Sequence, residues 1–188
     1  MKHIFVVLML IFSFKNVFAE QKPPCRAFPY WFQPICQRLY QIVAEGDTDL
    51  YLPVYTWHNR YKYSADRIDA YNELPLGAGF GKSLFDENGN WQGLYAMAFE
   101  DSHSNIEPVV GYAFLKIFTP KPEAKLGIGF TVLVTGRPDI FGGIPFPGAL
   151  PWASISYRQI SLAGTYIPGS HGAGNILFLV VKINLSDL

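Results

Sequence analysis

A period of two in hydrophobicity, which recurs along most of the chain after Asp47, is the feature that most constrains the fold. In residues 126–134 the even positions are Leu, Ile, Phe, Val and Val, and the odd positions between them are Gly, Gly, Thr and Leu. Successive side chains of a β-strand point to opposite faces of the sheet, so this alternation is typical of a strand whose two faces differ. Residues 51–63 and 91–99 also alternate, with Tyr and Trp frequent near their ends.

The alternation predicts eight strands, separated by turn sequences such as Asn88-Gly89-Asn90. An even number of antiparallel strands closes into a barrel that has no exposed edge. We therefore expect an all-β fold: an eight-stranded antiparallel transmembrane β-barrel with a short N-terminal amphipathic helix. The expected strands are residues 49–63, 70–83, 91–102, 108–119, 125–137, 150–158, 160–168 and 175–185.

The composition favours a surface that faces lipid. Charged residues make up 16% of the chain, against about a quarter in a typical soluble domain, and there are 15 Phe, 11 Tyr and 4 Trp. Beyond the N-terminal segment no apolar run has the length of a membrane-spanning helix, which leaves a closed barrel as the way to satisfy the backbone in lipid. Basic and acidic residues number 15 each, so the basic excess typical of nucleic-acid binding is missing.

The first residues have the pattern of a secretory signal. Lys2 and His3 precede the apolar run 4–14, which is followed by Val17-Phe18-Ala19. The run is about half the length that a membrane-spanning helix needs. We expect cleavage after Ala19, which removes two lysines and no acid and takes the formal charge from 0 to −2. The expected organisation is a signal peptide over 1–19, an N-terminal segment over 20–48 and the barrel over 49–188.

A short helix is predicted from Pro34 to about Glu45, because Pro suits the first helical turn and Gly46 suits the stop. Two placements of this helix are open: its apolar face lies in a membrane interface, which we favour, or it packs against its own domain. That apolar face consists of Ile35, Leu39, Ile42 and Val43.

The two cysteines, Cys25 and Cys36, both follow the predicted cleavage site. Export brings them into an oxidising compartment, where disulfides persist. One continuous helix between them would hold them about 16 Å apart, too far to pair, but Pro29 and Pro34 argue against such a helix. A disulfide that closes this loop and two free thiols are both open alternatives.

The predicted inner face is small and apolar, which favours a dry cavity for an acyl chain in a barrel just wide enough for one slim ligand. The alternative is that its glycines merely relieve strand coiling. The predicted inward positions are Leu50, Leu52, Val54, Gly77, Gly79, Gly111, Ala113, Gly127 and Gly129. Prolines, which remove ladder hydrogen bonds, mark places where neighbouring strands part and admit lipid sideways, or else are ordinary strand-end prolines. They are Pro53, Pro75, Pro151 and Pro168.

Reactive polar residues lie at the ends of two predicted strands. His58 shares the parity of Val54 and Thr56 and is expected to face the lumen, and Asp101 and Ser102 lie where the third strand gives way to a loop. A base, a carboxylate and a hydroxyl suit acyl transfer, although no nucleophile elbow surrounds the serine. The alternative is a surface histidine and a turn-forming Asp-Ser pair. The remaining histidines have no regular ligand spacing, so we predict no metal site.

Several stretches together resemble the outer-membrane lipid A palmitoyltransferases, the PagP family. They cover nearly the whole mature chain in order: YLPVYTWHNRYKY, DRIDAYNELPLGAGFGKS, NWQGLYAMAFEDS, LGIGFTVLVTGR and TYIPGS. The resemblance implies an outer-membrane barrel with an N-terminal amphipathic helix. It implies an enzyme that transfers an acyl chain, typically palmitoyl, from a glycerophospholipid to lipid A. We expect a monomer that needs no cofactor.

The resemblance assigns the catalytic roles to His58, Asp101 and Ser102. His58 is the implied base or proton shuttle, Ser102 a site hydroxyl or nucleophile, and Asp101 the group that orients His58 or stabilises its charge. The four prolines correspond to the lateral gates of the family. Asp49 and Arg137 correspond to a pair that ties the N-terminal helix to the barrel.

The chain departs from the family pattern at the floor of the acyl pocket. The family has Gly where this chain has Ala113, inside Gly111-Tyr112-Ala113, so we expect a raised floor and a slightly shorter acyl chain. His103 replaces a family Trp. Two other classes of protein remain as alternatives: an exported lipocalin-like carrier of a hydrophobic ligand, and a structural outer-membrane barrel without catalysis.

Overall fold

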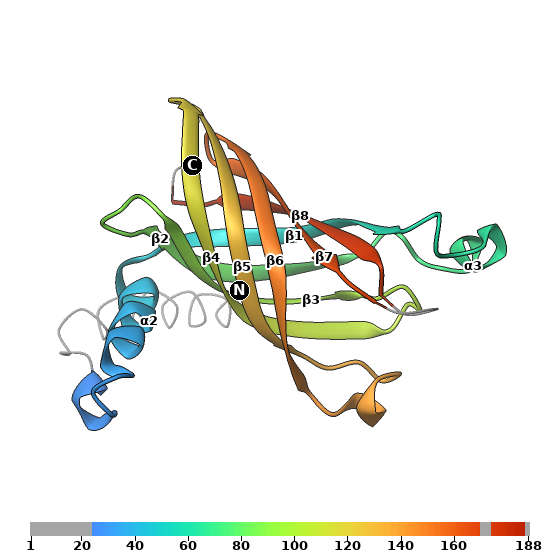
Figure 1. Cartoon of the computed structure of the whole chain (residues 1–188), viewed down its shortest axis with the longest axis horizontal. Helices are drawn as coiled ribbons and strands as arrows, with labels where there is room; N and C mark the ends of the chain where they lie inside the picture. Colours follow the sequence, from blue (N-terminus) through green and yellow to red (C-terminus); the bar gives the residue numbers. More distant parts are fainter. Residues whose placement is uncertain (1–23, 170–173, 187–188) are drawn as a thin grey trace, which may run out of the picture. The chain divides into compact units, whose positions relative to one another are not determined.

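The computed structural model describes residues 24–169 and 174–186 (Figure 1). The predicted signal segment and His171 lie outside the described residues. The chain divides into two compact units, Met1–Gly46 and Asp47–Leu188.

The described part of the first unit contains the 3₁₀ helix η2 (Pro24–Ala27) and the helix α2 (Gln33–Glu45). The predicted helix is confirmed, with Pro34 in its first turn and Gly46 extended after its end. Cys25 and Cys36 form a disulfide with their Cα atoms 5.7 Å apart, which decides between the two open alternatives. Among the described residues, the helices are all too short or too polar to cross a membrane.

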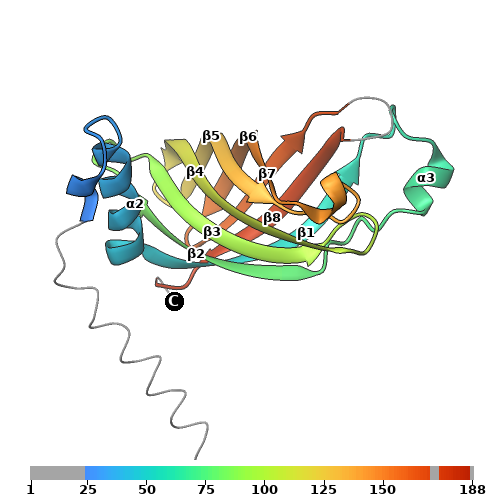
Figure 2. The same ribbon diagram turned by 90° about the horizontal axis from the view of Figure 1, so that it is seen from below.

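The second unit is a closed barrel of eight strands, each antiparallel to its neighbours (Figures 1 and 2). The predicted strand number and pairing are therefore confirmed. The strands are β1 (Asp47–His58), β2 (Gly77–Phe85), β3 (Trp91–Glu100), β4 (Ile106–Lys121), β5 (Ala124–Thr135), β6 (Phe146–Tyr157), β7 (Ile160–Ile167) and β8 (Ile176–Asn184). A 3₁₀ turn, η3 (Phe141–Gly143), lies between β5 and β6.

The first connection is longer than predicted. β1 ends at His58 rather than at residue 63, and β2 begins at Gly77 rather than at residue 70. Asn59 ends the strand because its side-chain oxygen accepts the N–H of Tyr61 and its carbonyl accepts the N–H of Lys62. The unpredicted helix α3 (Ala65–Asp69) occupies part of the connection. Residues 59–76 therefore form a loop that is free to fold back along β1.

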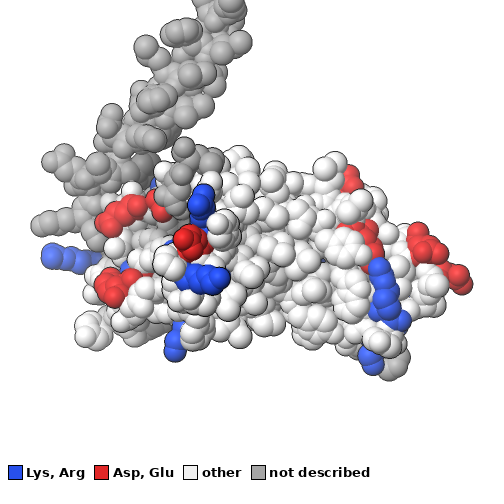
Figure 3. All heavy atoms as spheres, turned by 90° about the horizontal axis from the view of Figure 1, so that it is seen from above, with Lys and Arg blue, Asp and Glu red and all other residues white. Residues whose placement is uncertain are grey.

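The outward face of the barrel is apolar. On β5 the even positions Ile128 and Phe130 are 62% and 47% exposed, whereas the next residue, Thr131, is fully buried. On the face in Figure 3 a broad band without charged side chains lies across the middle of the barrel, and the charges gather towards its ends. Apolar residues outside and charges at the rims are what lipid surroundings require of a barrel.

The inward positions predicted for the first half of β1, namely Leu50, Leu52 and Val54, were wrong. Asp49 and Tyr51 are buried, whereas Val54 is 39% exposed. A register shift between Pro53 and Tyr55 in the pairing with β8 inverts the alternation. Beyond the shift, Thr56 and His58 point inward, as predicted. The reason given for this prediction is wrong, because Val54, which was taken to share their face, points outward.

A layer of aromatic rings fills the middle of the barrel. The Tyr95 ring packs against Tyr51 and Trp152, with centroid distances of 5.7 and 5.9 Å. The Tyr95 hydroxyl donates to Thr131 Oγ1 at 2.7 Å, because the Thr131 hydroxyl proton is given to the Tyr112 carbonyl. A side chain at Gly111 would overlap the Tyr95 phenol, so this glycine makes room for a ring rather than for a ligand.

Candidate active site

An apolar cavity of about 230 Å³ lies between the aromatic layer and one end of the barrel. We call this end the mouth; it is the end at which β1 and β3 finish, at His58 and Glu100. The sequence predicted an apolar cavity, but none of the nine inward positions on which that prediction was based lines this one, and Gly148 is the only glycine among the described residues that do. Its apolar wall includes Met97, Phe99, Val109, Leu133 and Phe178, with Tyr95 and Trp152 on the side of the aromatic layer.

The structure brings His58 and Ser102 together at the mouth. Nε2 of His58 lies 2.9 Å from Oγ of Ser102, and both side chains are buried. His58 is the last residue of β1, and Ser102 lies in the turn after β3. The carbonyl of Ser102 accepts the N–H of Asn72, so the long first connection holds the turn in place.

Glu73, in the same connection, contacts the other ring nitrogen of His58. Oε1 of Glu73 is 3.0 Å from Nδ1 of His58 and also accepts the His58 backbone N–H at 3.2 Å. Arg60 donates to both carboxylate oxygens, at 2.6 and 2.7 Å. These guanidinium hydrogen bonds, followed by those from His58 and Tyr55, hold the pKa of Glu73 well below its usual range.

Glu73 was missed at the level of sequence, although it lies inside the stretch DRIDAYNELPLGAGFGKS that carries the family resemblance. The stretch was predicted to be mostly strand, and strand geometry gives no reason for residue 73 to return to β1. In the structure the Glu73 carbonyl accepts the N–H of Thr56 at 2.9 Å, so the loop runs back along β1.

Asp101 contacts the turn and an arginine instead of the His58 ring. Its Oδ1 accepts the backbone N–H groups of His103 and Asn105, both at 2.8 Å. Its Oδ2 lies 3.3 Å from Nη2 of Arg137, an ion pair without hydrogen-bond geometry. Asp101 therefore shapes the turn that carries Ser102, and the orienting contact expected of it is made by Glu73.

Arg137 is the centre of an ion-pair network at the mouth. Its guanidinium lies 2.8 Å from Asp139 and 3.7 Å from Glu107, in addition to the contact with Asp101. The expected pair between Asp49 and Arg137 is wrong, because β1 begins at the end opposite the mouth and β5 finishes at the mouth. Asp49 instead bonds Lys182 at 2.9 Å and Ser83 at 2.5 Å.

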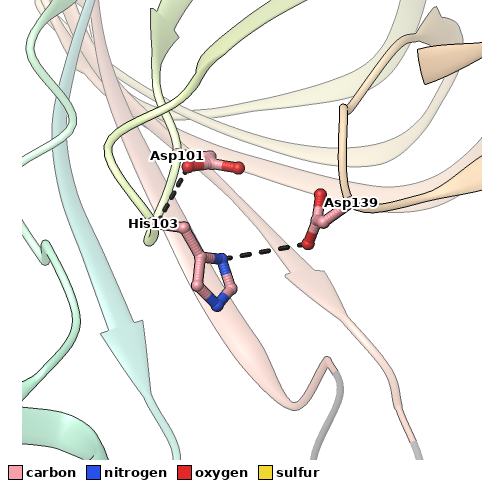
Figure 4. Close-up of side chains that lie close together, drawn as sticks. All are labelled: Asp101, His103 and Asp139. Atoms are coloured by element: carbon pink, nitrogen blue, oxygen red, sulfur yellow. Dashed lines mark hydrogen bonds and ion pairs between the residues drawn. The ribbon is translucent and has the colours of Figure 1, made fainter. Parts of the chain in front are cut away.

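Asp101, His103 and Asp139 lie close enough together to offer three ligand atoms to a metal (Figure 4). Nδ1 of His103 is 3.8 Å from Asp139. The Arg137 guanidinium already lies against both carboxylates, and it lowers the pKa of Asp139. A cation of the protein itself therefore already lies against both carboxylates, and a metal would have to displace it.

Two strand ladders stop short of the mouth, next to the predicted prolines. The pairing of β1 with β2 ends at Tyr51 and Gly79, just before Pro53, although β1 pairs with β8 as far as His58. The pairing of β6 with β7 ends at Ala153 and Gly164, and Pro151 lies beyond it. The remaining two prolines, Pro75 and Pro168, lie in the connections next to the same two gaps.

Ala113 is fully buried and faces the interior of the barrel. It pairs with Gly93 on one side and with Thr131, the hydrogen-bond partner of Tyr95, on the other. The residues that line the cavity include Tyr95 but not Ala113. Ala113 is therefore not part of the cavity wall, and its link to Tyr95 runs through Thr131.

Comparison with known proteins finds one family and several relatives. Residues 38–182 match the family described as antimicrobial peptide resistance and lipid A acylation protein PagP. A relative from Legionella longbeachae is 54% identical over 89% of this chain and 74% of its own length. One from Legionella pneumophila is 48% identical over 98% and 100%, and one from Bordetella pertussis is 55% identical over 82% and 85%. All three are named lipid A acyltransferase PagP.

Proposed function

Because the chain belongs to the PagP family, we propose that it is an enzyme, a lipid A acyltransferase that takes its acyl chain from a glycerophospholipid. One observation carries this proposal most directly: Ser102, whose Oγ is 2.9 Å from Nε2 of His58, lines the apolar cavity. The cavity binds the acyl chain by excluding water, and the His58–Ser102 pair acts on the ester at the end of that chain.

The reaction is an exchange of one ester for another, with His58 moving a proton. In the direct route a lipid A hydroxyl attacks the donor's carbonyl carbon and gives its proton to Nε2 of His58. The tetrahedral intermediate collapses, the bond to the glycerol oxygen breaks, and that oxygen takes the proton from Nε2. In the covalent route Ser102 makes the first attack and lipid A the second, with the same proton movements.

The outer membrane is the proposed location. The apolar outward face of the barrel supports insertion into lipid, and the N-terminal apolar run 4–14 supports export with cleavage after Ala19. We propose a monomer whose two ladder gaps, beside Pro53 and Pro151, admit lipid from the membrane plane to the cavity.

The two other classes of protein are less well supported. A soluble lipocalin-like carrier does not need the exposed apolar side chains of β5, such as Ile128 and Phe130. A structural barrel does not need a buried histidine bonded to a serine that lines a cavity.

Acyl length is proposed to depend on Ala113 acting through the aromatic layer. Ala113 pairs across the ladder with Thr131, which holds the Tyr95 hydroxyl, and we propose that the Ala113 methyl group in this way limits how far the Tyr95 ring can move away from the cavity. A chain slightly shorter than palmitoyl is the proposed substrate.

Transfer of a labelled acyl chain from phospholipid to lipid A by the purified protein in detergent tests the proposal. The parent is expected to acylate lipid A, and His58→Ala, Ser102→Ala and Asp101→Ala are expected to lower kcat/KM, the first two by about 10²- to 10⁴-fold. Full activity in all three folded variants would contradict the site. A parent that binds labelled lipid without transferring it would favour the carrier.

A further inference from the structure

We propose that Glu73 is the carboxylate that positions His58 for proton transfer, while Asp101 positions Ser102. This assignment rests on the proposed acyl transfer and adds a positioning residue to it. It divides between two acids the role that the family resemblance gives to Asp101 alone.

The contacts of Glu73 determine which nitrogen of His58 carries its proton. An ionised carboxylate only accepts hydrogen bonds, so Nδ1 of His58, 3.0 Å from Glu73 Oε1, must be the protonated nitrogen. Nε2 is then the lone-pair nitrogen, and it faces Ser102 Oγ at 2.9 Å. The Ser102 hydroxyl therefore donates to His58, as a hydroxyl must before a base removes its proton.

Glu73 is itself held in one orientation. Arg60 donates to its two oxygens at 2.6 and 2.7 Å, and the Tyr55 hydroxyl donates to Oε2 at 2.9 Å. The backbone N–H of His58 adds a fourth contact, to Oε1 at 3.2 Å. Because the donors come from β1 and from residue 60 just beyond its end, the carboxylate cannot swing away from the His58 ring without losing several charge-assisted bonds.

Asp101 contacts its own turn and Arg137 rather than His58. Its Oδ1 is saturated by the two backbone N–H groups of the turn, and its Oδ2 faces Arg137. Neither oxygen is available to Nδ1 of His58, which Glu73 already contacts. Loss of Asp101 should therefore move Ser102, and loss of Glu73 should change His58.

The test compares Glu73→Ala, Glu73→Gln and Glu73→Asp in full-length, processed protein in detergent micelles. Glu123→Gln is the matched control, because Glu123 is an exposed glutamate between β4 and β5, at the end opposite the mouth. Glu73→Ala is expected to lower kcat/KM for lipid A acylation by about 10²-fold or more. Glu73→Asp, which keeps the charge, should recover part of the loss, and Glu123→Gln should match the parent.

A second readout separates positioning from mere support of the loop. Protein labelled with ¹⁵N-histidine reports by NMR which nitrogen of neutral His58 bears the proton, with His58→Gln used for assignment. The parent and Asp101→Asn should show the proton on Nδ1, and Glu73→Ala should show a shift of the proton towards Nε2.

Two results would overturn the inference. One is a folded Glu73→Ala protein whose kcat/KM stays within about threefold of the parent. The other is a lowered activity with the His58 proton still on Nδ1, which would make Glu73 a loop-supporting residue only. If the parent itself transfers no acyl chain, the proposed function fails instead, and the NMR comparison still decides what Glu73 does to His58.

Discussion

Nε2 of His58 lies 2.9 Å from Oγ of Ser102, although the two residues are 44 positions apart and lie at the ends of β1 and β3, which are not neighbours in the barrel. β2 lies between β1 and β3, but it begins only at Gly77, which is farther from the mouth than the His58–Ser102 pair. Because β2 begins far from the mouth, the connection 59–76 lies between the ends of β1 and β3. His58 and Ser102 contact each other there.

Replacement of Ser102 tests this pair. Ser102→Ala removes the hydroxyl that faces Nε2 of His58, and we expect kcat/KM to fall by about 10²- to 10⁴-fold. Ser64→Ala is the matched control, because Ser64 is exposed in the same mouth and its side chain does not cap α3. Acylation rates measured with both variants in detergent decide the point, and equal losses would refute a specific role for Ser102.

Removal of Arg60 should weaken the loop 59–76 at neutral pH and flatten its response to acid. The pKa of folded Glu73 is depressed, so its contribution to loop stability is complete above its unfolded pKa of about 4.3 and is lost as the pH falls from there through the lower folded value. In Arg60→Ala the main cause of the depression is gone, so the folded and unfolded pKa values of Glu73 lie closer together and less stability is left for acid to remove. Proteolysis of this loop as a function of pH measures the difference, with Arg67→Ala as a control. Superimposable profiles for Arg60→Ala and the parent would contradict the prediction.

The barrel was predictable because period-two alternation is a local property that each strand carries by itself. Residues 126–134 identify both faces of β5 without knowledge of any partner. The faces of β1 were not predictable in the same way, because the register shift at Pro53 inverts them and such a shift is set by the pairing with β8.

The site was predictable only in part. His58 and Ser102 were found from the strand ends and the resemblance, but the role of Glu73 depends on how a long loop folds back along β1. Loops of this length carry no periodic signal, and their conformation is decided by contacts such as that of the Glu73 carbonyl with Thr56. The ion pairs of Arg137 could not be predicted for the same reason, since they join two connections and the start of β4 at the mouth.

Chelation should leave the activity unchanged. Asp101, His103 and Asp139 have the spacing of metal ligands, but the Arg137 guanidinium already lies against both carboxylates. Acylation by the purified protein in detergent should therefore be the same before and after incubation with EDTA. Loss of activity that one divalent cation restores would show that a metal displaces the guanidinium.

Ala113 is expected to set the length of the transferred chain. Ala113→Gly removes a methyl group beside Thr131 and lets the Tyr95 ring settle away from the cavity, which should lengthen the preferred acyl chain by about one or two methylene groups. Mass spectrometry of the acylated lipid A, with donors of graded length, measures the preference. Ala98→Gly is the matched control, because Ala98 is exposed on the outer face of β3 and the substitution is the same. The idea fails if Ala113→Gly and Ala98→Gly give the same chain-length profile as the parent, and a shift in Tyr95→Phe alone would place the floor at the Tyr95–Thr131 hydrogen bond instead.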